Sequence, residues 1–365
     1  MRGSTTQQIP MLSTLTPEQL VPLDHPLRRI KVIVDQALAE LSPVFDAMYA
    51  ANGRASIPPE RLLKGCLLIA LYSIRSERQL CEQLQYNLLF KWFLDMDVET
   101  PAFDATSFTK NRDRLLSHEV APRFFQAVLA QAKAARLISA EHFTVDGTLL
   151  EAWASLKSFQ PREGADHRPR GSGGSRNPAV DFRGTFRSND THVSSTDPEA
   201  RLFTKGRHQT AKLCYSGNVL MENRNGMVVD VLVAPATGRA ERETALRMLQ
   251  RHGSGRRRRT VGADKAYDTE DFVTGCRALG VTPQVARNIT PYRGSHIDDR
   301  SARQPGYVIG QRVRKRVEEI FGWVKTVGGG RKLRYIGVER NQLWAELTAS
   351  AYNLVRMSKL LAETA

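Results

Sequence analysis

The chain has 365 residues, of which 41% are hydrophobic, enough for a sizeable buried core divided between two domains. Lys and Arg number 53 against 38 Asp and Glu, and the net charge of +15 favours a polyanionic partner such as nucleic acid over an acidic small molecule. A high net charge can also serve only to keep a protein soluble. Composition therefore leaves open both a nucleic-acid partner and a charge that only maintains solubility.

The cysteines and the apolar runs indicate where the protein is found. Cys66, Cys81, Cys214 and Cys276 are too widely spaced for paired metal ligands and too few for a disulfide framework, which predicts buried, reduced thiols. The first 20 residues lack a signal-peptide pattern, and no apolar window approaches about 18 residues. We therefore expect a cytoplasmic protein with no membrane partner.

The stretch 26–138 has apolar residues at helical spacing and few strand signals. One stripe comprises Ile30, Val34, Leu38 and Leu41, and a second begins at Leu62 after two prolines. Further helices are predicted over 77–86, 106–116 and 121–136. Residues 1–138 are therefore predicted to form an all-helical N-terminal domain.

Beyond residue 139 the pattern becomes mixed α/β. A short strand is predicted over 143–148, and a hairpin has arms at 213–222 and 227–234 around an Asn225-Gly226 turn. The next predicted elements are a helix over 240–250, a strand over 260–264 and a helix over 270–279. Residues 139–365 are predicted to form one α/β domain.

The segment 159–196 interrupts this domain and is rich in Gly, Ser, Pro and Arg, which predicts a mobile loop. It is either a basic arm that touches DNA or a solvated insertion. The arginines of the first interpretation are Arg162, Arg168, Arg170, Arg176, Arg183 and Arg187.

Two aspartates stand where strands are predicted to end. Phosphodiester cleavage needs an activated oxygen nucleophile and relief of phosphate charge, which two Mg²⁺ ions about 4 Å apart supply. Hard carboxylate oxygens suit Mg²⁺, and Mn²⁺ accepts the same donors. Asp146 follows the run 143–145 and Asp264 follows 260–263, each before a loop-like segment. Both are candidate catalytic metal ligands, although a lone Asp after a strand is also a common turn residue.

A third acid lies in a predicted helix over 313–325. Arg314, Glu318 and Lys325 fall within roughly 40° on one helical face, next to an apolar stripe. A salt-bridged surface helix has the same spacing. Six other acids compete for the metal-ligand role: Glu151, Asp268, Glu270, Asp298, Asp299 and Glu319.

At these residues the sequence resembles the DDE transposases of bacterial insertion sequences, in the group whose third motif is Arg, three residues, Glu, six residues, Lys. Further similarity lies in TVDGT (144–148), TDPEAR (196–201), LMENRNG (220–226), ADKAYD (263–268), SERQL (76–80) and LFKWF (89–93). Two positions depart from the family pattern, with Gln311 where Tyr is frequent and Ala266 where Gly is usual.

The resemblance implies a ribonuclease-H-like mixed-sheet catalytic domain after a helical, DNA-end-binding domain. It implies that Asp146, Asp264 and Glu318 hold two Mg²⁺ ions and that Arg314 and Lys325 contact DNA. The partners would be double-stranded transposon ends and target DNA, bound by a homodimer associated with the nucleoid.

The helix 106–116 is our candidate for reading the terminal repeat. Thr106 is positioned to cap it, and Lys110, Arg112 and Arg114 are expected near one face. A solvated helix face would have the same composition. Two rival functions also stay open: a metal-dependent nuclease that stops after hydrolysis, and a non-catalytic DNA-binding protein with structural carboxylates.

Overall fold

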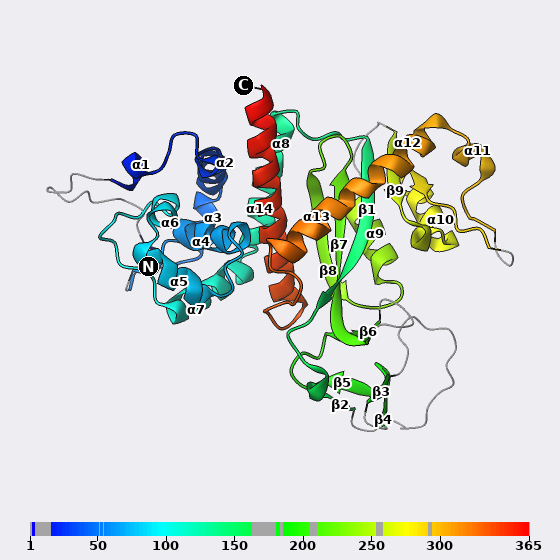
Figure 1. Cartoon of the computed structure of the whole chain (residues 1–365), viewed down its shortest axis with the longest axis horizontal. Helices are drawn as coiled ribbons and strands as arrows, with labels where there is room; N and C mark the ends of the chain where they lie inside the picture. Colours follow the sequence, from blue (N-terminus) through cyan, green and yellow to red (C-terminus); the bar gives the residue numbers. More distant parts are fainter. Residues whose placement is uncertain are drawn as a thin grey trace. The chain divides into compact units, whose positions relative to one another are not determined.

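The computed structural model describes residues 2–3, 16–50, 52–53, 55–162, 180–182, 185–204, 210–252, 258–290 and 294–364 (Figure 1). The chain divides into two compact units. The helical unit comprises Met1–Leu137, Trp323–Gly329 and Glu346–Ala365, and the sheet unit comprises Ile138–Gly322 and Gly330–Ala345. Two C-terminal segments thus belong with the N-terminal helices, so the prediction of one domain over 139–365 does not hold for them.

The helical unit begins with eight helices along the described part of its N-terminal segment. They are α1 (Pro17–Leu20), α2 (Pro26–Glu40), α3 (Ser42–Ala47), α4 (Pro59–Leu71), α5 (Glu77–Tyr86), α6 (Leu88–Phe93), α7 (Ala105–Ser117) and α8 (Val120–Ala134). Their starts follow from sequence, because proline occupies the first turn of α2 and α4 and the Ser76 hydroxyl accepts from the Gln79 amide at 3.1 Å. Asp104, rather than the predicted Thr106, caps α7 by accepting from the Ser107 amide at 2.8 Å.

The long C-terminal helix α14 (Val338–Thr364) was not predicted, and its second half completes the core of the helical unit. Ala351, Leu354 and Met357 are buried, and Tyr352 makes an edge-on contact with Trp323 at 5.8 Å between ring centroids. The Ser73 hydroxyl donates to the Val327 carbonyl at 2.9 Å.

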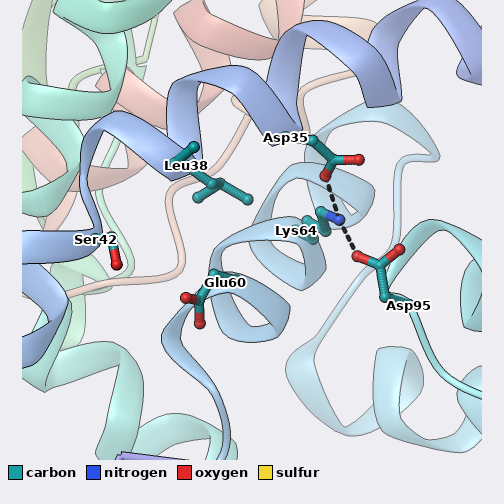
Figure 2. A pocket seen from close by; sticks show the side chains of 7 residues that line it. Asp35, Leu38, Ser42, Glu60, Lys64 and Asp95 are labelled. Atoms are coloured by element: carbon teal, nitrogen blue, oxygen red, sulfur yellow. Dashed lines mark hydrogen bonds and ion pairs between the residues drawn. The ribbon is translucent and has the colours of Figure 1, made fainter. Parts of the chain in front are cut away.

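A cavity of about 410 Å³ lies in the helical unit beside an ion-pair network centred on the buried Lys64 (Figure 2). Lys64, 1% exposed, pairs with Asp35 at 2.5 Å and with Asp95, and Lys31 pairs with both aspartates at 2.6 Å. Two cations thus face two anions, so the network is balanced in charge and joins α2 to α4 and to the turn after α6.

The sheet unit is built on a six-stranded mixed sheet in the order β10-β9-β1-β7-β6, with β8 also paired to β7. The strands are β1 (His142–Glu151), β6 (Arg201–Phe203), β7 (Lys212–Glu222), β8 (Val228–Pro235), β9 (Arg259–Ala263) and β10 (Val281–Val285). β1, β7 and β8 are antiparallel neighbours, whereas β9 and β10 run parallel to β1. This arrangement is the predicted ribonuclease-H-like sheet.

Helices cover both faces of this sheet (Figure 1). On one face α9 (Ala240–Arg251) and α10 (Glu270–Ala278) pack on alternate strand residues that include Phe143, Val145 and Val261. The intervening residues Thr144, Gly262 and Gln284 are register neighbours on the opposite face, where α12 (Pro305–Val313) packs. β7 and β8 are buried almost throughout, as expected for strands covered on both faces.

Several predicted boundaries were wrong in informative ways. β1 continues to Glu151, because β7 pairs with it along its whole second half, so Asp146 lies within a strand rather than at its end. The described part of 159–196 contains two antiparallel pairs, β2 (Phe159–Pro161) with β5 (His192–Ser194) and β3 (Val180–Phe182) with β4 (Thr185–Arg187). Arg168, Arg170, Arg176 and Arg183 lie outside the described residues.

Arg162 and Arg187, the described arginines of this segment, bond to backbone carbonyls. Arg162 donates to His192 at 3.4 Å, and Arg187 donates to Phe159 at 3.0 Å. Within the described part of the chain, no helix is long and apolar enough to cross a membrane.

Candidate active site

Asp146 lies in β1, and Asp264 directly follows the neighbouring strand β9. The parallel register pairs Thr144 with Gly262, and two further residues along each strand lead to Asp146 and Asp264. Adjacent strands are about 4.8 Å apart, so the two carboxylates leave the sheet as close neighbours. β9 ends at Ala263, and the Asp264 carboxylate caps the short helix η2 (Lys265–Tyr267) by accepting from the Ala266 amide at 2.7 Å.

The environment of Asp146 strongly disfavours its charge. Burial raises the pKa of Asp146 to about 7, and the negative charges of Asp264 and Glu241 act in the same direction. The Gly147 amide, which donates to Asp146 Oδ1 at 2.8 Å, and the Arg314 guanidinium partly oppose this shift. Perturbation of this kind by burial and by like charge is typical of functional sites.

The third motif is not the single α-helix that we predicted. α12 ends at Val313, residues Arg314–Arg316 form the 3-10 turn η3, and α13 runs over Val317–Thr326. A 3-10 turn is wound more tightly than an α-helix, which changes the angles between side chains around the axis. The predicted alignment of Arg314, Glu318 and Lys325 on one helical face therefore no longer applies.

Arg314 is held against the sheet on the face of Asp146. A Cβ on Gly262 would lie 3.2 Å from Arg314 Cβ, so the missing side chain admits η3. Gln311, at the position where the family often has Tyr, accepts from Arg314 Nε at 3.0 Å and donates to the Gln284 carbonyl at 2.5 Å. Gln311 therefore ties Arg314 to β10.

Arg316 fixes the other side of η3. Its guanidinium donates to the carbonyls of Asn223 at 3.0 Å and Arg224 at 2.6 Å, in the turn between β7 and β8. The Asn223 side chain in turn accepts from the Thr144 hydroxyl at 2.7 Å. Glu318 follows two residues after Arg316 and is exposed. Lys325 lies seven residues further along α13, in the segment counted with the helical unit.

Among the residues that the structure describes, no three His, Cys, Asp or Glu side chains are grouped as one metal ion would require. The structure therefore brings Asp146 and Asp264 together but does not bring Glu318 to them. The aspartate pair still fits a divalent cation, because it supplies hard oxygen donors and because a cation would relieve the repulsion that acts on Asp146.

Four competing acids have structural partners instead. Glu151 pairs with Lys212 at 2.6 Å, and Asp299 pairs with Arg287 at 2.8 Å. The other two are Asp298, which caps α11 (Asp299–Ala302), and Asp268.

Burial of Asp268 acts to raise its pKa, but hydrogen bonds from Ser295 and from the amides of Asn288 and His296, at 2.7 and 2.9 Å, lower it. These two amides make Asp268 an anchor for the segment after β10.

Two residues near the aspartates were not predicted from sequence. Glu241 lies in the first turn of α9 and acts on Asp146, and Tyr267 lies in η2 with its side chain in the core. An acid in the first turn of a helix is normally explained by the helix dipole, so the sequence alone gave no reason to select Glu241.

The predicted DNA-reading face of α7 does not contain all three basic residues. Arg112 is 8% exposed and pairs with Glu77 and, at 2.8 Å, with Asp113. It lies about 200° from Lys110 around the helix, so the prediction of one face was wrong for Arg112. Lys110 is exposed, and Arg114 is half-buried over the Tyr49 ring at 4.7 Å.

This fold and site define a class of enzyme: a ribonuclease-H-like domain with paired carboxylates suited to metal-dependent phosphodiester chemistry. Two family models agree. One, described as "Transposase domain (DUF772)", matches residues 15–114, and the other, "Transposase DDE domain", matches residues 189–354. The chain belongs to the DDE transposases of insertion sequences, a family that depends on divalent metal ions.

Two solved structures have low similarity to this chain. A piggyBac transposase synaptic complex with hairpin DNA has 11% identity and a TM-score of 0.41 over 95% of this chain and 78% of that one. A Mos1 transposase paired-end complex has 12% identity and a TM-score of 0.20 over 78% and 84% of the respective chains. No curated protein matches the sequence.

Proposed function

We propose that this transposase binds the terminal inverted repeats of an insertion sequence, cleaves the DNA at these ends and joins them to target DNA. Asp146, Asp264 and Glu318 are the proposed ligands of two Mg²⁺ ions, which Mn²⁺ can replace. The observation that supports this best is the pair formed by Asp146 in β1 and Asp264 directly after β9, where burial and the negative charge of Asp264 raise the pKa of Asp146 to about 7.

The chain's own residues supply position and charge. β1 and β9 fix the two aspartates on a rigid sheet, and η3 carries Arg314 to the same face. When bound, the metal ions supply an activated oxygen nucleophile and neutralise phosphate charge. Arg314 is suited to bind a DNA phosphate beside the carboxylates, because its guanidinium donates in a planar fork.

DNA contacts outside the site are proposed from charge, at one exposed residue, Lys110, and two half-buried residues, Arg114 and Lys325. Lys110 on α7 is the proposed end-binding residue of the helical unit, with Arg114 beside it, and Lys325 is a proposed phosphate contact on α13. Pairing of two ends suits a homodimer. Light scattering of the protein with end DNA should give the mass of two chains, and a mass of one chain would contradict the dimer.

The decisive test of the metal-ligand assignment compares neighbouring acids on one helix. Glu318→Gln should abolish Mg²⁺-dependent cleavage of end DNA, whereas Glu319→Gln, also exposed, should keep activity within a few fold of wild type. Asp146→Asn and Asp264→Asn should be as inactive as Glu318→Gln. Full activity of any of these three variants would remove that residue from the assignment.

Strand transfer separates the proposed function from its nuclease alternative. Pre-cleaved end DNA with a free 3′-hydroxyl, mixed with a supercoiled plasmid, should give joined products. Cleavage without any joining would indicate a nuclease, and DNA binding without metal-dependent cleavage would indicate a non-catalytic binding protein.

A further inference from the structure

Trp153 presents an indole ring to solvent just after the end of β1. It is 53% exposed, whereas Trp92 is buried and the other two tryptophans, Trp323 and Trp344, are half-buried. An indole is large and mostly apolar, and in most proteins it is largely covered. A single exposed apolar side chain is nevertheless common, so the surroundings decide whether this ring has a function.

The backbone on both sides of Trp153 is held by the sheet unit. The Ala152 amide donates to the Leu213 carbonyl at 2.8 Å, and the side chains of Ala152 and Ala154 are buried. Because both neighbours pack in the interior, the Trp153 side chain points away from it. A ring on an anchored backbone loses little conformational freedom when it binds a ligand.

A distant segment of the sheet unit places a cation on this ring. Lys332 Nζ lies 5.7 Å from the centroid of the Trp153 ring. Lys332 is fixed in turn, because it forms a parallel bridge with Glu151 and because the amide of the buried Leu333 donates to the Glu151 carbonyl at 2.7 Å. The electron-rich face of an indole attracts such a cation, which steadies the ring.

The surface around the ring is basic. Arg331 and Lys332 are exposed, and so is Lys157, which follows Trp153 by four residues. The neighbouring acid, Glu151, is paired with a lysine at 2.6 Å. The Trp153 patch, which we define as Trp153, Lys157, Arg331 and Lys332, therefore combines a flat aromatic ring with several cations.

This combination suits a nucleotide whose base is unpaired. Cations attract the phosphates of a nucleic acid strand, and an aromatic ring stacks on the face of a base whatever its identity. Inside a paired duplex the faces of each base are covered by the adjacent base pairs, so an external ring cannot reach them. The ring thus distinguishes unpaired DNA from paired DNA, whereas the cations bind both.

The Trp153 patch is close enough to the aspartates to contact the same DNA molecule. Trp153 follows Asp146 by seven residues, and seven residues span at most about 25 Å. Successive nucleotides lie about 3.4 Å apart along a strand of duplex DNA. A strand held at Asp146 therefore reaches Trp153 within about seven nucleotides.

We propose that the Trp153 patch binds an unpaired nucleotide of the end DNA. The Trp153 ring stacks on the base, and Lys157 and Lys332 contact the flanking phosphates. Base pairs next to a cut open more easily than those inside a duplex, because a broken strand holds them on one side only, and an open base costs the least to capture. This role rests on the proposed function, since it concerns the DNA on which that function acts.

DNA binding by the full-length protein without metal tests this role. Fluorescence anisotropy is measured with two labelled probes, an oligothymidylate single strand and a fully paired duplex of the same length. Trp153→Ala should weaken oligothymidylate binding about tenfold and duplex binding less than about twofold. Trp153→Phe, which keeps a flat ring, should recover most of the lost affinity. Unchanged oligothymidylate affinity of Trp153→Ala, or an equal loss for both probes, would overturn the proposal.

Tyr86→Ala is the matched control, because Tyr86 is an aromatic residue of the helical unit that is 67% exposed. It should change oligothymidylate affinity less than about twofold. Unchanged oligothymidylate binding by Trp153→Ala, together with loss of dimer mass in light scattering, would assign the ring to a contact between copies of the chain and would likewise overturn the proposal.

Salt dependence separates stacking from charge. Lys332→Gln should reduce the slope of log affinity against log salt concentration by about 0.7 for the single strand, because one phosphate contact is lost. Trp153→Ala should leave this slope unchanged, because a stacked ring releases no counter-ions. A reduced slope for Trp153→Ala would mean that the ring acts only by positioning the cations, and would contradict stacking.

The wild-type protein distinguishes failure of this role from failure of the proposed function. If wild type cleaves end DNA with Mg²⁺ and Trp153→Ala binds oligothymidylate normally, the role of Trp153 fails and the proposed function stands. If wild type does not cleave but Trp153→Ala loses oligothymidylate binding alone, the proposed function fails and the Trp153 patch is still a nucleotide-binding surface.

Discussion

At the scale of single residues, Asp146 shows how a carboxylate can be selected by its surroundings. Many acids in this chain have cations or amides as partners, as Asp268 and Glu151 do. Asp146 also accepts from the Gly147 amide, but its burial and the negative charges of Asp264 and Glu241 outweigh this bond and raise its pKa to about 7. Ionisation of Asp146 is therefore less favourable than that of an exposed aspartate, and a bound cation would favour it.

This shift predicts a pH-dependent effect of Asp146→Asn on stability. The folded-state pKa, about 7, exceeds the unfolded value near 3.8, so the stability that this group contributes is full below about pH 4 and is lost as the pH rises through 7. Without metal, Asp146→Asn should therefore raise the melting temperature above that of wild type by much more at pH 8 than at pH 5. The control is Asp24→Asn, an exposed position, which should change the midpoint equally little at both pH values. A stabilising effect that is independent of pH would contradict the assignment.

Arg112 and Lys110 are two residues apart but have different expected roles. Arg112→Ala removes the cation paired with the half-buried Glu77, which still accepts from the Thr109 hydroxyl, and should lower the free energy of unfolding by about 1–3 kcal/mol. Lys110→Ala should change the free energy of unfolding by less than about 0.5 kcal/mol. It should nevertheless lower the affinity for end DNA, and it should reduce the slope of log affinity against log salt concentration by roughly 1.

Chemical denaturation and a salt titration of DNA binding measure these two effects. Lys133→Ala, exposed on α8, is the charge-matched control for Lys110→Ala. DNA binding that is insensitive to Lys110→Ala would leave α7 as a structural helix.

At the scale of elements, the 3-10 turn η3 is the part of the site most sensitive to displacement. Its 3 residues join two helices and are fixed by Arg314 on one side and Arg316 on the other. Side chains at a helical junction depend on such tethers, because a change of a few degrees is amplified along the following helix.

Arg316→Ala should therefore reduce cleavage about tenfold, because η3 loses its bonds to the turn between β7 and β8 and Glu318 lies only two residues beyond η3. The expected loss of stability is about 1 kcal/mol. Lys315→Ala, the exposed neighbour, is the control and should retain activity. A kinetic assay on end DNA, combined with a denaturation measurement, shows whether cleavage is lost because η3 is displaced or because the protein unfolds. Equal cleavage by Arg316→Ala and Lys315→Ala would contradict the role of Arg316 in holding η3.

Periodicity predicted the elements whose partners lie close in sequence. The hairpin of β7 and β8 and the helices α5, α7, α9 and α10 agree with prediction to within a few residues. The length of β1 was underestimated, because residues 147–151 are strand only through pairing with β7, more than 60 residues away. Glu241 and Tyr267 were missed for the same reason, since their proximity to Asp146 depends on tertiary packing.

At the scale of the whole molecule, the 4 cysteines report on the integrity of both units. Cys66 and Cys81 lie in the helical unit, Cys214 and Cys276 lie in the sheet unit, and all are buried and free. Burial raises the pKa of Cys81 to about 11 and of the other three to about 12. Thiolate, the reactive form, is therefore scarce at neutral pH.

The folded protein should accordingly react very slowly with a disulfide reagent such as DTNB at pH 8, and all four thiols should react at once in guanidinium chloride. Absorbance of the released thiolate counts them. Rapid reaction of two thiols in the native protein would indicate that one unit opens independently of the other.

The helical unit is discontinuous along the chain: its first 137 residues are followed by the sheet unit, and its last helical segment begins only at Glu346. On a ribosome that adds about 5–20 residues per second, the N-terminal helices wait roughly 10–40 s for this segment. A copy of the gene truncated before that point would encode most of the catalytic sheet but leave the N-terminal helices without their final partner. Nonsense mutations near the 3′ end should therefore be as damaging as those near the start.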